Sequence, residues 1–429
     1  MGRQRARGII KRQHFPMTTL PRDPKTALES RYARRADGMK ASEIRELLKV
    51  LDKPGIISFG GGIPDPVLFP AEEAKAAYSA ILSDPASMKA GLQYSVSEGY
   101  QPLREWIATY MATLGVPCTP DNIAVTSGSQ QALEFLGKLF LTEGDTALVE
   151  APTYLGALQA FSAYEPRYDT LTPENGNRTP QSYVEAASQN GGSVKFLYVV
   201  PDFANPTGKT LTKAAREGLL SLSDALDAPI LEDTAYSALR FAGEPVAPIQ
   251  ALDVARHGGD INKSRVIYCG TFSKTLTPGL RIGWICASEA LVRRVVLIKQ
   301  ASDLNTSNIN QMVMHRLASE TFDRQVGQAR TLYQGRRTAM LAALEAHMPP
   351  GVTWTTPEGG LFVWLTLPAH CNGKALLKRA VEEFNVAFVP GSAFFADGQG
   401  QNTIRLSYSL PNEEMIAEGV RRLGQLLEE

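Results

Sequence analysis

Short apolar runs alternate with stretches of helical periodicity between about residue 120 and residue 300. The apolar runs cover residues 122–126, 146–150, 196–200, 229–233 and 266–270, and helical stretches such as 130–140 and 213–227 follow several of them. This alternation predicts a largely parallel sheet with helices on both faces. In such a sheet a ligand binds beyond the carboxyl ends of the strands. The polar segments that follow these runs are therefore the places where a site is expected.

The last third of the chain follows a different pattern. Residues 309–345 have the periodicity of one or two long helices, and residues 413–427 that of a terminal helix. Short strands are expected at 354–356, 362–365, 387–389 and 403–407, around a further helix at 374–384. Mixed short strands and helices predict a separate α+β lobe. We expect residues 24–65 to form an arm that packs on this lobe or on a partner.

Length and charge restrict the class of protein. The chain has 429 residues, which is long for one simple core, so two lobes are expected. A formal net charge of zero argues against a nucleic-acid binder that uses a broad basic face. No apolar run reaches the length of a membrane-spanning helix. We expect a cytoplasmic protein that binds neither nucleic acid nor membrane.

The cysteines and the N-terminus add two expectations. The four cysteines are scattered, with no C-x-x-C pair and no histidine cluster, so we expect buried free thiols in a reducing cytosol and no metal site. The first 22 residues are basic, and no acidic residue precedes Asp23. Because no long apolar segment follows, a disordered basic tail over residues 1–30 is favoured over a signal peptide, with Met17 as a candidate initiator.

Lys274 has the most informative surroundings of any residue. It lies in the run Gly-Thr-Phe-Ser-Lys-Thr-Leu-Thr-Pro-Gly-Leu-Arg-Ile-Gly at residues 270–283, directly after an apolar run. A lysine at the end of a buried strand is costly unless it has a task. An amine with hydroxyls before it and Arg281 after it is what pyridoxal 5'-phosphate (PLP) requires, namely a Schiff-base amine and a phosphate cup. On this run alone, a surface turn remains the alternative.

Two further polar segments follow predicted strands. Residues 126–132, Thr-Ser-Gly-Ser-Gln-Gln-Ala, open a helix, where the amides of Ser129 and Gln130 are placed to bind phosphate. A plain helix cap explains this segment equally well. Residues 202–208, Asp-Phe-Ala-Asn-Pro-Thr-Gly, form a turn that aims the Asn205 amide above the strand ends, although most such turns are only turns.

Two charged residues stand at the ends or inside predicted strands. Asp233 ends an apolar run, where it is either a helix cap or, in a PLP site, the partner of the pyridine nitrogen that makes the ring an electron sink. Arg405 lies inside an alternating strand, where it is expensive unless it finds a carboxylate for its fork. A structural salt bridge is the alternative for Arg405.

The order and spacing of these segments resemble the class I/II aminotransferases of PLP fold type I. Asn205, Asp233, Lys274 and Arg281 follow one another at intervals of 28, 41 and 7 residues. The resemblance extends over residues 40–429. Four segments are similar to the subgroup of 2-aminoadipate and kynurenine aminotransferases: 44–48 (Ile-Arg-Glu-Leu-Leu), 58–64 (Ser-Phe-Gly-Gly-Gly-Ile-Pro), 92–99 (Leu-Gln-Tyr-Ser-Val-Ser-Glu-Gly) and 359–364 (Gly-Gly-Leu-Phe-Val-Trp).

The resemblance implies a fold and an assembly. It implies an α/β protein with an aspartate aminotransferase-like large domain, in which a mostly parallel seven-stranded sheet is sandwiched by helices, and a smaller α+β C-terminal domain. We expect an N-terminal arm at 31–65, a PLP-binding domain at 66–305 and a small domain at 306–429. The resemblance also implies a homodimer whose subunits share their active sites.

The resemblance assigns roles to cofactor-binding residues. Lys274 would form the Schiff base with PLP and act as the catalytic base. The remaining cofactor contacts would be Ser129, Gln130, Thr271, Ser273 and Arg281 around the phosphate, Tyr94 at the phosphate from the other subunit, Tyr154 on the ring, Asn205 and Tyr236 at the phenolic oxygen, and Asp233 at the ring nitrogen.

The resemblance also implies a reaction and a substrate site. Arg405 would bind the substrate carboxylate, with Asn205 and Tyr94 nearby. Arg45 would meet a distal carboxylate, although a solvated helix charge is its ordinary interpretation, and Gly62 would let a bulky side chain approach. The implied activity is transamination between a 2-oxo acid and a 2-aminoadipate, aromatic or aliphatic amino acid, with glutamate and 2-oxoglutarate as one pair.

Two other classes of function remain open at this stage. A PLP-dependent lyase or decarboxylase would keep the same lysine and the same ring partner, and only the similarity to the subgroup argues against it. A transcriptional regulator with an aminotransferase-like domain would need a DNA-binding module upstream. About 40 residues precede the segment of resemblance, which we expect to be too few and too irregular for such a module.

Overall fold

The computed structural model of the chain describes residues 28–36 and 55–428. The expected basic tail falls almost entirely outside these residues, and Arg45 lies outside them as well. The strands are β1 (Ile57–Ser58), β2 (Ile123–Thr126), β3 (Thr146–Glu150), β4 (Arg167–Leu171), β5 (Val194–Val199), β6 (Ile230–Asp233), β7 (Val266–Thr271), β8 (Gly283–Cys286), β9 (Thr353–Trp354), β10 (Phe362–Thr366), β11 (Val386–Ala387), β12 (Val389–Pro390) and β13 (Thr403–Ser407).

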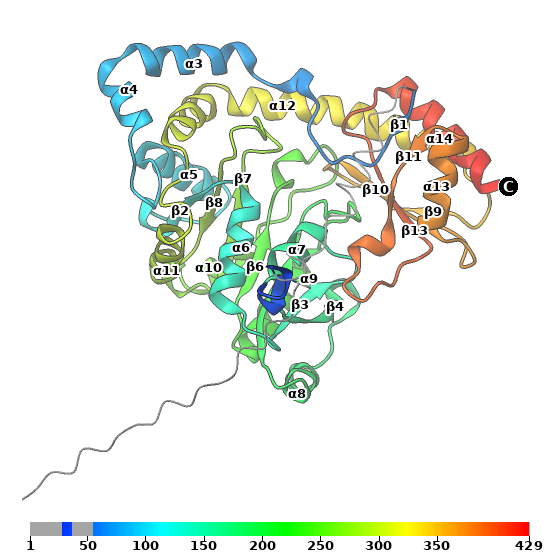
Figure 1. The fold of residues 1–429 in the computed structure, drawn as a ribbon, viewed down its shortest axis with the longest axis horizontal. Coiled ribbons are helices and arrows are strands. Elements are labelled where there is room, and N and C mark those ends of the chain that lie inside the picture. Colours follow the sequence, from blue (N-terminus) through cyan, green and yellow to red (C-terminus); the bar gives the residue numbers. More distant parts are fainter. Residues whose placement is uncertain (1–27, 37–54, 429) are drawn as a thin grey trace, which may run out of the picture.

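The α-helices of the described residues are found in both the sheet-rich part and the C-terminal part of the chain (Figure 1). They are α3 (Ala71–Ser83), α4 (Pro85–Leu92), α5 (Gln101–Thr113), α6 (Ser129–Phe140), α7 (Leu155–Ser162), α8 (Pro180–Gln189), α9 (Lys213–Leu226), α10 (Ile249–Arg256), α11 (Glu289–Gln300), α12 (Asn308–His347), α13 (Gly373–Glu383) and α14 (Glu413–Glu428).

A seven-stranded sheet forms the centre of the larger part. Its strand order is β2-β8-β7-β6-β5-β3-β4, and every pairing is parallel except the two that β8 makes with β7 and β2. The predicted α/β class with a mostly parallel sheet is therefore confirmed. Because β8 reverses direction between two strands that run the same way, β2, β3, β5, β6 and β7 all end at one edge of the sheet.

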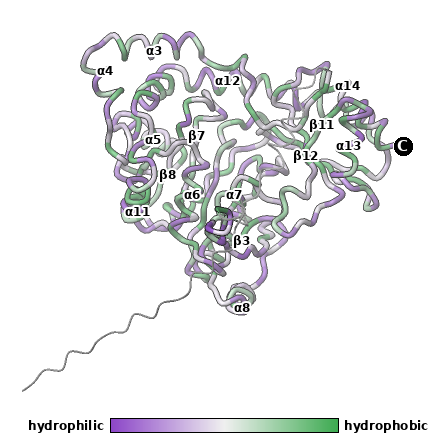
Figure 2. The backbone as a smooth tube through the Cα atoms, viewed as in Figure 1, coloured by the Kyte–Doolittle hydropathy of each residue, from purple (hydrophilic) through white to green (hydrophobic). Residues whose placement is uncertain are grey.

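Helices cover both faces of this sheet. Side chains of α6, α7 and α11 form one apolar cluster with the strands, and side chains of α8 and α9 form another on the opposite face. A third cluster joins α5, α10 and α12 to β2, β7 and β8. Figure 2 shows that the hydrophobic segments lie in the interior, along strands such as β7. Burial of both faces explains why these strands read as continuous apolar runs.

Two strands of the sheet were not predicted from the apolar pattern. Strand β4 is the edge strand and reads Arg-Tyr-Asp-Thr-Leu, with only Leu171 buried, so it carries no apolar run. Strand β8 has only four residues, all buried, and directly follows the segment that contains Arg281. Short and edge strands are missed by a prediction based on apolar runs because they form mainly through packing against the neighbouring strand, not through a strong pattern of their own.

The C-terminal part is built around a four-stranded sheet of order β12-β13-β10-β9. The pattern of residues 309–345 belongs to a single helix, α12, which has 40 residues and packs on α3, α4 and α5 at one end and on α14 at the other (Figure 1). Strand β1 pairs in parallel with β11. The described end of the N-terminal arm thus packs on the C-terminal part.

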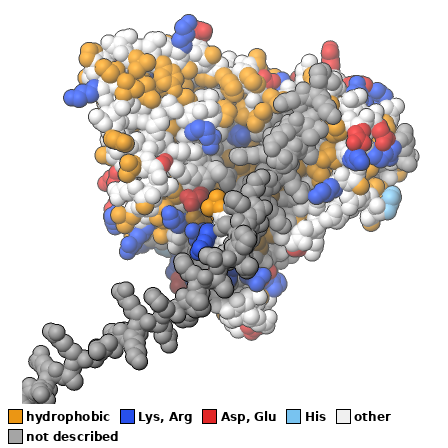
Figure 3. All heavy atoms as spheres, viewed as in Figure 1, with side chains coloured by type: hydrophobic (Ala, Val, Ile, Leu, Met, Phe, Trp, Pro, Cys, Tyr) orange, Lys and Arg blue, Asp and Glu red, His pale blue; other side chains and the backbone are white. Residues whose placement is uncertain are grey.

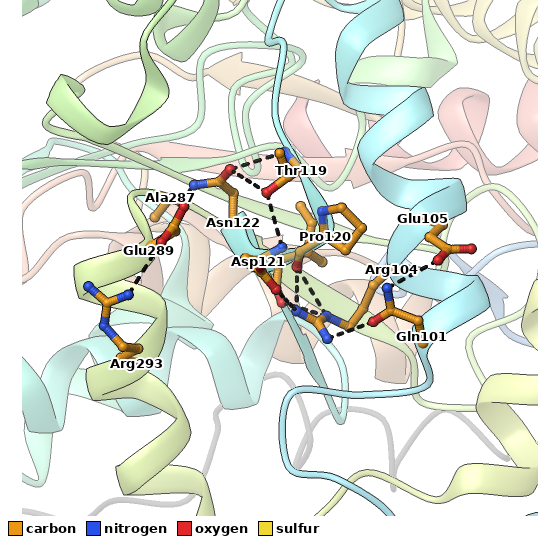
Figure 4. A network of polar contacts seen from close by, with 11 residues as sticks. Gln101, Arg104, Glu105, Thr119, Pro120, Asp121, Asn122, Ala287, Glu289 and Arg293 are labelled. Atoms are coloured by element: carbon orange, nitrogen blue, oxygen red, sulfur yellow. Dashed lines mark hydrogen bonds and ion pairs between the residues drawn. The ribbon is translucent and has the colours of Figure 1, made fainter.

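A network of polar contacts holds the start of β2 in place (Figure 4). This strand leads to Ser129, a candidate phosphate-binding residue. Arg104 of α5 is buried and donates to the carbonyl oxygens of Pro120 and Ile123. The side-chain amide of Asn122 donates to the carbonyl of Ala287 at 3.0 Å. Satisfied buried polar groups of this kind anchor β2 to α5 and to the end of β8.

Two further observations concern the cysteines and the long helices. All four cysteines are free, as expected. Cys269 and Cys286 are buried, but Cys118 and Cys371 are only half-buried, so the expectation of burial for all four is wrong for two of them. Among the described residues, no helix is long and apolar enough to cross a membrane.

Candidate active site

The predicted chemical residues gather at the edge where the parallel strands end. Ser129 follows β2, Tyr154 follows β3, Asn205 follows β5, and Asp233 is the last residue of β6. Lys274 follows β7. Arg281 precedes β8, which runs in the opposite direction and so starts at the same edge. The sheet topology alone therefore brings together residues that are far apart in sequence.

Lys274 connects the loop after β7 to the segment that follows β1. Its Nζ donates to the carbonyl oxygen of Gly62 at 2.8 Å and lies 5.8 Å from the ring centroid of Tyr236. Burial lowers the pKa of this amine to about 8, and the positive charges of Arg405 and Arg281 contribute. A lysine with such a pKa is partly neutral near physiological pH, which is the form that attacks a carbonyl or accepts a proton.

Asp233 has one satisfied oxygen and one unsatisfied oxygen. The hydroxyl of Tyr198 donates to its Oδ2 at 2.8 Å, while the buried Oδ1 accepts no hydrogen bond within the described part of the chain. Burial raises the pKa of this carboxyl to about 6, against the lowering effect of Tyr198. A buried carboxylate oxygen without a donor is costly, and a protonated ring nitrogen would satisfy it.

Arg405 is a buried cation with no carboxylate beside it among the described residues. Its Nη1 donates to Oδ1 of Asn205 and its Nη2 to the carbonyl of Gly60, both at 2.7 Å. The guanidinium lies 4.3 Å from the ring centroid of Phe362 and 5.0 Å from that of Phe394. Its Nε has no partner in the described chain, and burial lowers its pKa to about 10. The structural salt bridge considered above is thus absent from the described residues.

The phosphate-cup candidates surround the start of α6. Gly128 precedes the helix with φ 88°, a conformation that favours glycine, and the first amides of α6 have no partner within the helix. A Cβ on Gly283 would lie 2.8 Å from the amide nitrogen of Ser129, so a glycine in β8 permits this close approach. Arg281, with φ 57°, donates from Nη2 to the carbonyl of Ser127 at 3.4 Å.

Hydroxyls and aromatic rings complete the cluster. The hydroxyl of Thr271 lies 2.9 Å from that of Ser273, next to Lys274. Tyr154 lies across Gly156, where an added Cβ would come within 2.6 Å of the Tyr154 ring. The side chain of Gln130 donates to the Gly156 carbonyl at 2.7 Å, which leaves its backbone amide as its contribution to the cup.

The remaining predicted residues differ in how they relate to the cluster. Tyr236 is buried, and a hydrogen bond with Asn205 acts on its hydroxyl. Gly62 contacts the cluster through Lys274. Tyr94 is 78% exposed and makes no side-chain hydrogen bond to the cluster within the described residues of its own chain. Arg45 lies outside the described residues.

The sequence interpretation missed several residues that complete the geometry. Tyr198 lies in an apolar strand, and its hydroxyl group was the only feature of the sequence that could have indicated its hydrogen bond to Asp233. Phe362 and Phe394 flank Arg405, and Phe362 also lies under Gly62, where an added Cβ would come within 2.6 Å of its ring. Phe362 occurs in a segment that carried the resemblance, but aromatic packing around a cation cannot be predicted from spacing.

The described residues fit PLP. The cofactor needs a lysine amine, an acceptor for its ring nitrogen and a cup for its phosphate. Lys274 offers the amine, the unpartnered Oδ1 of Asp233 offers the acceptor, and the start of α6 with Arg281 offers the cup. The family signature described as "Aminotransferase class I and II" matches residues 65–423.

The chain belongs to this family. It is 44% identical to a 2-aminoadipate transaminase of Thermus thermophilus over 396 residues, 92% of this chain and 96% of the relative. It is 41% identical to aromatic-amino-acid aminotransferase 1 of Thermococcus litoralis over 411 residues, 95% of this chain and 96% of the relative. The chain is therefore a PLP-dependent aminotransferase of fold type I.

A solved structure shares this fold. The kynurenine aminotransferase of Pyrococcus horikoshii, solved in complex with PMP, is 40% identical, with a TM-score of 0.85 over 94% of this chain and 98% of that chain. The fold and the family of this aminotransferase thus agree with the position of Asp233 and Lys274 at the carboxyl ends of β6 and β7. The relatives from Thermus thermophilus and Thermococcus litoralis are both named aminotransferases, which favours transamination over the lyase alternative.

Proposed function

We propose that this aminotransferase transfers the amino group between glutamate and 2-oxoglutarate on one side and a 2-aminoadipate, aromatic or aliphatic amino acid on the other. The observation that carries the proposal is Arg405, a buried guanidinium without a carboxylate among the described residues, in the same cluster as the Lys274 amine. A substrate carboxylate would supply the missing anion. The named activities of the two relatives, 2-aminoadipate and aromatic amino acids, set the range of partners.

Arg405 would bind the α-carboxylate and orient the substrate. Two of its nitrogens are fixed by Asn205 and Gly60, and the rings of Phe362 and Phe394 limit where the guanidinium can lie. A preorganised guanidinium loses little entropy when a carboxylate arrives. The α-carbon of a substrate held in this way would face the Lys274 amine.

Lys274 would move the proton. With its lowered pKa, its neutral amine would accept the proton from the α-carbon of the substrate and would donate it again later in the reaction. Bound PLP supplies an electron-withdrawing ring that stabilises the charge left on the substrate carbon. Asp233 would keep that ring protonated through its Oδ1, while Tyr198 holds the carboxylate in place.

Further contacts would fix the cofactor in the site. Ser129, Gln130, Thr271, Ser273 and Arg281 would bind the phosphate. Tyr154 would lie on the ring, and Asn205 and Tyr236 would contact the phenolic oxygen. Support comes from their position around one strand edge and from the strained backbone of Arg281, since such strain is typical of functional sites.

Arg45 and Gly62 would act on the substrate side chain. We assign Arg45 to the distal carboxylate of glutamate and 2-aminoadipate. The variant Arg45→Met should lower kcat/KM for these two substrates and leave leucine and phenylalanine nearly unchanged. An equal loss for all four amino acids would contradict the assignment.

The active unit would be a homodimer that shares its active sites. Tyr94 is 78% exposed beside Leu92 and Val96, which are 64% and 58% exposed. Hydrophobic side chains gather over α3 and α4 (Figure 3). An exposed apolar surface of this kind marks an interface, and Tyr94 would reach the phosphate of the other subunit from it.

A complementation experiment tests the shared site. Chains with Tyr94→Ala and chains with Lys274→Ala are each expected to be nearly inactive. When the two are co-expressed, mixed dimers would contain one site with both native residues, so activity should return. If mixing restores nothing, Tyr94 acts within its own chain or not at all.

We also propose a division into lobes and a cellular location. The large lobe would comprise residues 66–305 and the small lobe residues 306–429, preceded by an arm at 31–65. The free state of all four cysteines supports a reducing compartment, and we propose the cytoplasm.

The decisive experiment follows the absorbance of the bound cofactor. The protein is purified with PLP, and single amino acids are added under anaerobic conditions without an oxo acid. Glutamate should remove the visible absorbance of bound PLP and 2-oxoglutarate should restore it, and the other amino acids can then be ranked by the same change. Release of ammonia or carbon dioxide without the change in absorbance would favour a lyase or decarboxylase and overturn the proposal.

A further inference from the structure

A buried lysine outside the catalytic cluster lies at the end of α11. The side chain of Lys299 is fully buried. Its Nζ donates to both carboxylate oxygens of Asp303 at 3.0 Å, to the hydroxyl of Thr306 at 2.8 Å and to Oε1 of Gln131 at 3.3 Å. Burying a cation is expensive, and a complete set of partners is required to offset the loss of water. The burial of Lys299 with these partners therefore suggests a function besides packing.

The partners of Lys299 converge on one residue, Ser127. Oδ2 of Asp303 accepts the hydroxyl of Ser127 at 3.3 Å and the side-chain amide of Gln131 at 2.8 Å. Oε1 of Gln131 accepts the backbone amide of Ser127 at 2.8 Å. The Ser127 hydroxyl also lies 3.3 Å from that of Thr306. The amide and the hydroxyl of Ser127 thus both face Lys299, Asp303, Gln131 and Thr306, which we call the Lys299 network.

Ser127 is the residue that leads into the phosphate cup. It stands between the end of β2 and Gly128, whose φ of 88° turns the chain so that Ser129 can open α6. Its carbonyl accepts from Arg281. With its amide held by Gln131 and its carbonyl facing Arg281, the orientation of the Ser127 peptide groups is fixed before an anion binds. Such preorganisation lowers the cost of binding.

The segment after α11 is shaped to deliver Asp303 to this position. The carbonyl of Lys299 accepts the backbone amides of Ser302, Asp303 and Leu304, each at 3.0 Å. Leu304 has φ 63°, a left-handed conformation that a leucine seldom adopts. Strain at such a residue persists only where the surroundings enforce it. The turn therefore holds the Asp303 carboxylate against Ser127 and Gln131.

We infer that Lys299 and Asp303 are positioning residues for the phosphate of PLP, acting through Gln131 and Ser127 on the amides at the start of α6. The inference rests on the proposed place of the phosphate at Ser129, Gln130 and Arg281. Neither Lys299 nor Asp303 needs to touch the cofactor. Their effect should depend on the phosphate and should vanish for a ligand that lacks it.

The test compares PLP with pyridoxal, the same ring without the phosphate. Apoenzymes of Lys299→Met and Asp303→Asn are titrated with each compound, and the dissociation constants are measured by absorbance. We expect the dissociation constant of PLP to rise about tenfold, as for the loss of one charge-assisted hydrogen bond, while that of pyridoxal stays within about twofold. Ser127→Ala should change the affinity for PLP in the same direction by a smaller factor.

Arg336→Met provides a matched control. Arg336 is also a buried cation, paired with Asp65 at 2.6 Å, but it lies in α12 away from the start of α6. Its variant should lower the Tm without changing the ratio of the two dissociation constants. If Lys299→Met does not fold, Asp303→Asn and Ser127→Ala carry the test.

Two outcomes would overturn the inference. If Asp303→Asn weakens PLP and pyridoxal by the same factor, or weakens neither, the Lys299 network serves the fold and not the phosphate. The variant Arg281→Gln shows whether only the inference about Lys299 fails or whether the proposed phosphate site fails as well. If Arg281→Gln removes the preference for PLP and Asp303→Asn does not, only the inference fails. If the wild type shows no preference for PLP over pyridoxal, the phosphate cup itself is misplaced and both fail.

Discussion

The Nζ of Lys274 donates to the carbonyl oxygen of Gly62 at 2.8 Å, a bond between the loop after β7 and the segment that follows β1. Gly62 also faces Phe362, which lies 4.3 Å from the Arg405 guanidinium. One glycine therefore contacts both the amine that we propose as the proton carrier and the ring beside the cation that we propose as the carboxylate binder. Changes at Gly62 should affect both.

Gly62→Ala should damage substrate binding. A Cβ at this position would lie 2.6 Å from Cζ of Phe362, so the ring must move and the Arg405 guanidinium with it. Overpacking of this kind costs about 1–3 kcal/mol, and we expect KM for the amino acid to rise about 5- to 160-fold. Gly61→Ala is the matched control, because its Cβ would meet Ile63 only at 3.8 Å. Equal kinetics for the two variants would contradict the role of Gly62.

Lys274→Ala should abolish catalysis while the protein still folds. The variant removes the only group assigned to proton transfer, so kcat should fall by at least about 10²–10⁴-fold. The visible absorbance of the covalently bound cofactor should be lost. Steady-state assays and an absorbance spectrum check the prediction, and a far-UV circular dichroism spectrum should match that of the wild type. Substantial remaining activity would show that another residue moves the proton.

The reaction of apoenzyme with PLP should accelerate as pH rises through about 8. Burial and the charges of Arg405 and Arg281 lower the pKa of Lys274 to about 8, and only the neutral amine attacks the PLP carbonyl. The rate, measured by stopped-flow absorbance, should therefore increase with rising pH up to about pH 8 and change little at higher pH. Arg405→Gln removes one of the lowering charges, so its midpoint should move to higher pH. A wild-type midpoint near 10 would contradict the assignment.

Arg405→Lys should weaken the binding of all amino acids. Lysine keeps the charge but cannot bond Asn205, Gly60 and a carboxylate at once as the guanidinium fork can. We expect kcat/KM to fall on the order of 10- to 100-fold for every substrate, since hydrogen bonds to charged groups contribute about 1.5–3 kcal/mol. The affinity for PLP, measured by titration, should hardly change. If only dicarboxylic substrates were affected, Arg405 would bind the distal carboxylate and the assignment to the α-carboxylate would be wrong.

Asp233→Asn and Tyr198→Phe should differ in severity. The first removes the charge that would keep the ring nitrogen protonated, so kcat should fall at least about tenfold. The second removes one donor to Oδ2 and leaves Oδ1 in place, so kcat should fall only about 2- to 10-fold. Because Tyr198 lowers the pKa of Asp233, its loss should move the acid limb of the pH–rate profile to higher pH. If kcat fell equally in both variants, the Asp233 oxygen that matters for catalysis would be Oδ2 and not Oδ1.

The sequence by itself determined the α/β class with its mostly parallel sheet, and the family. The apolar run at 146–150 and the alternating segment at 403–407 became β3 and β13 with the same bounds, because strands buried on both faces or alternating in a sheet leave a clear pattern. Asp233 and Lys274 were found because a charged residue at the end of an apolar strand is expensive and therefore informative. Their order along the chain then pointed to the aminotransferases.

Only the tertiary structure decided how these residues meet. The bond of Tyr198 to Asp233, the rings of Phe362 and Phe394 beside Arg405, and the contact of Lys274 with Gly62 join segments up to 212 residues apart. Lys299 gave no sequence signal, since a lysine at the end of a helix is ordinarily a solvated charge. Its burial and its partners depend on the turn at Leu304 and on the packing of α11 against α6. Periodicity records which face of an element is buried, whereas the identity of the neighbour across that face is set by the fold.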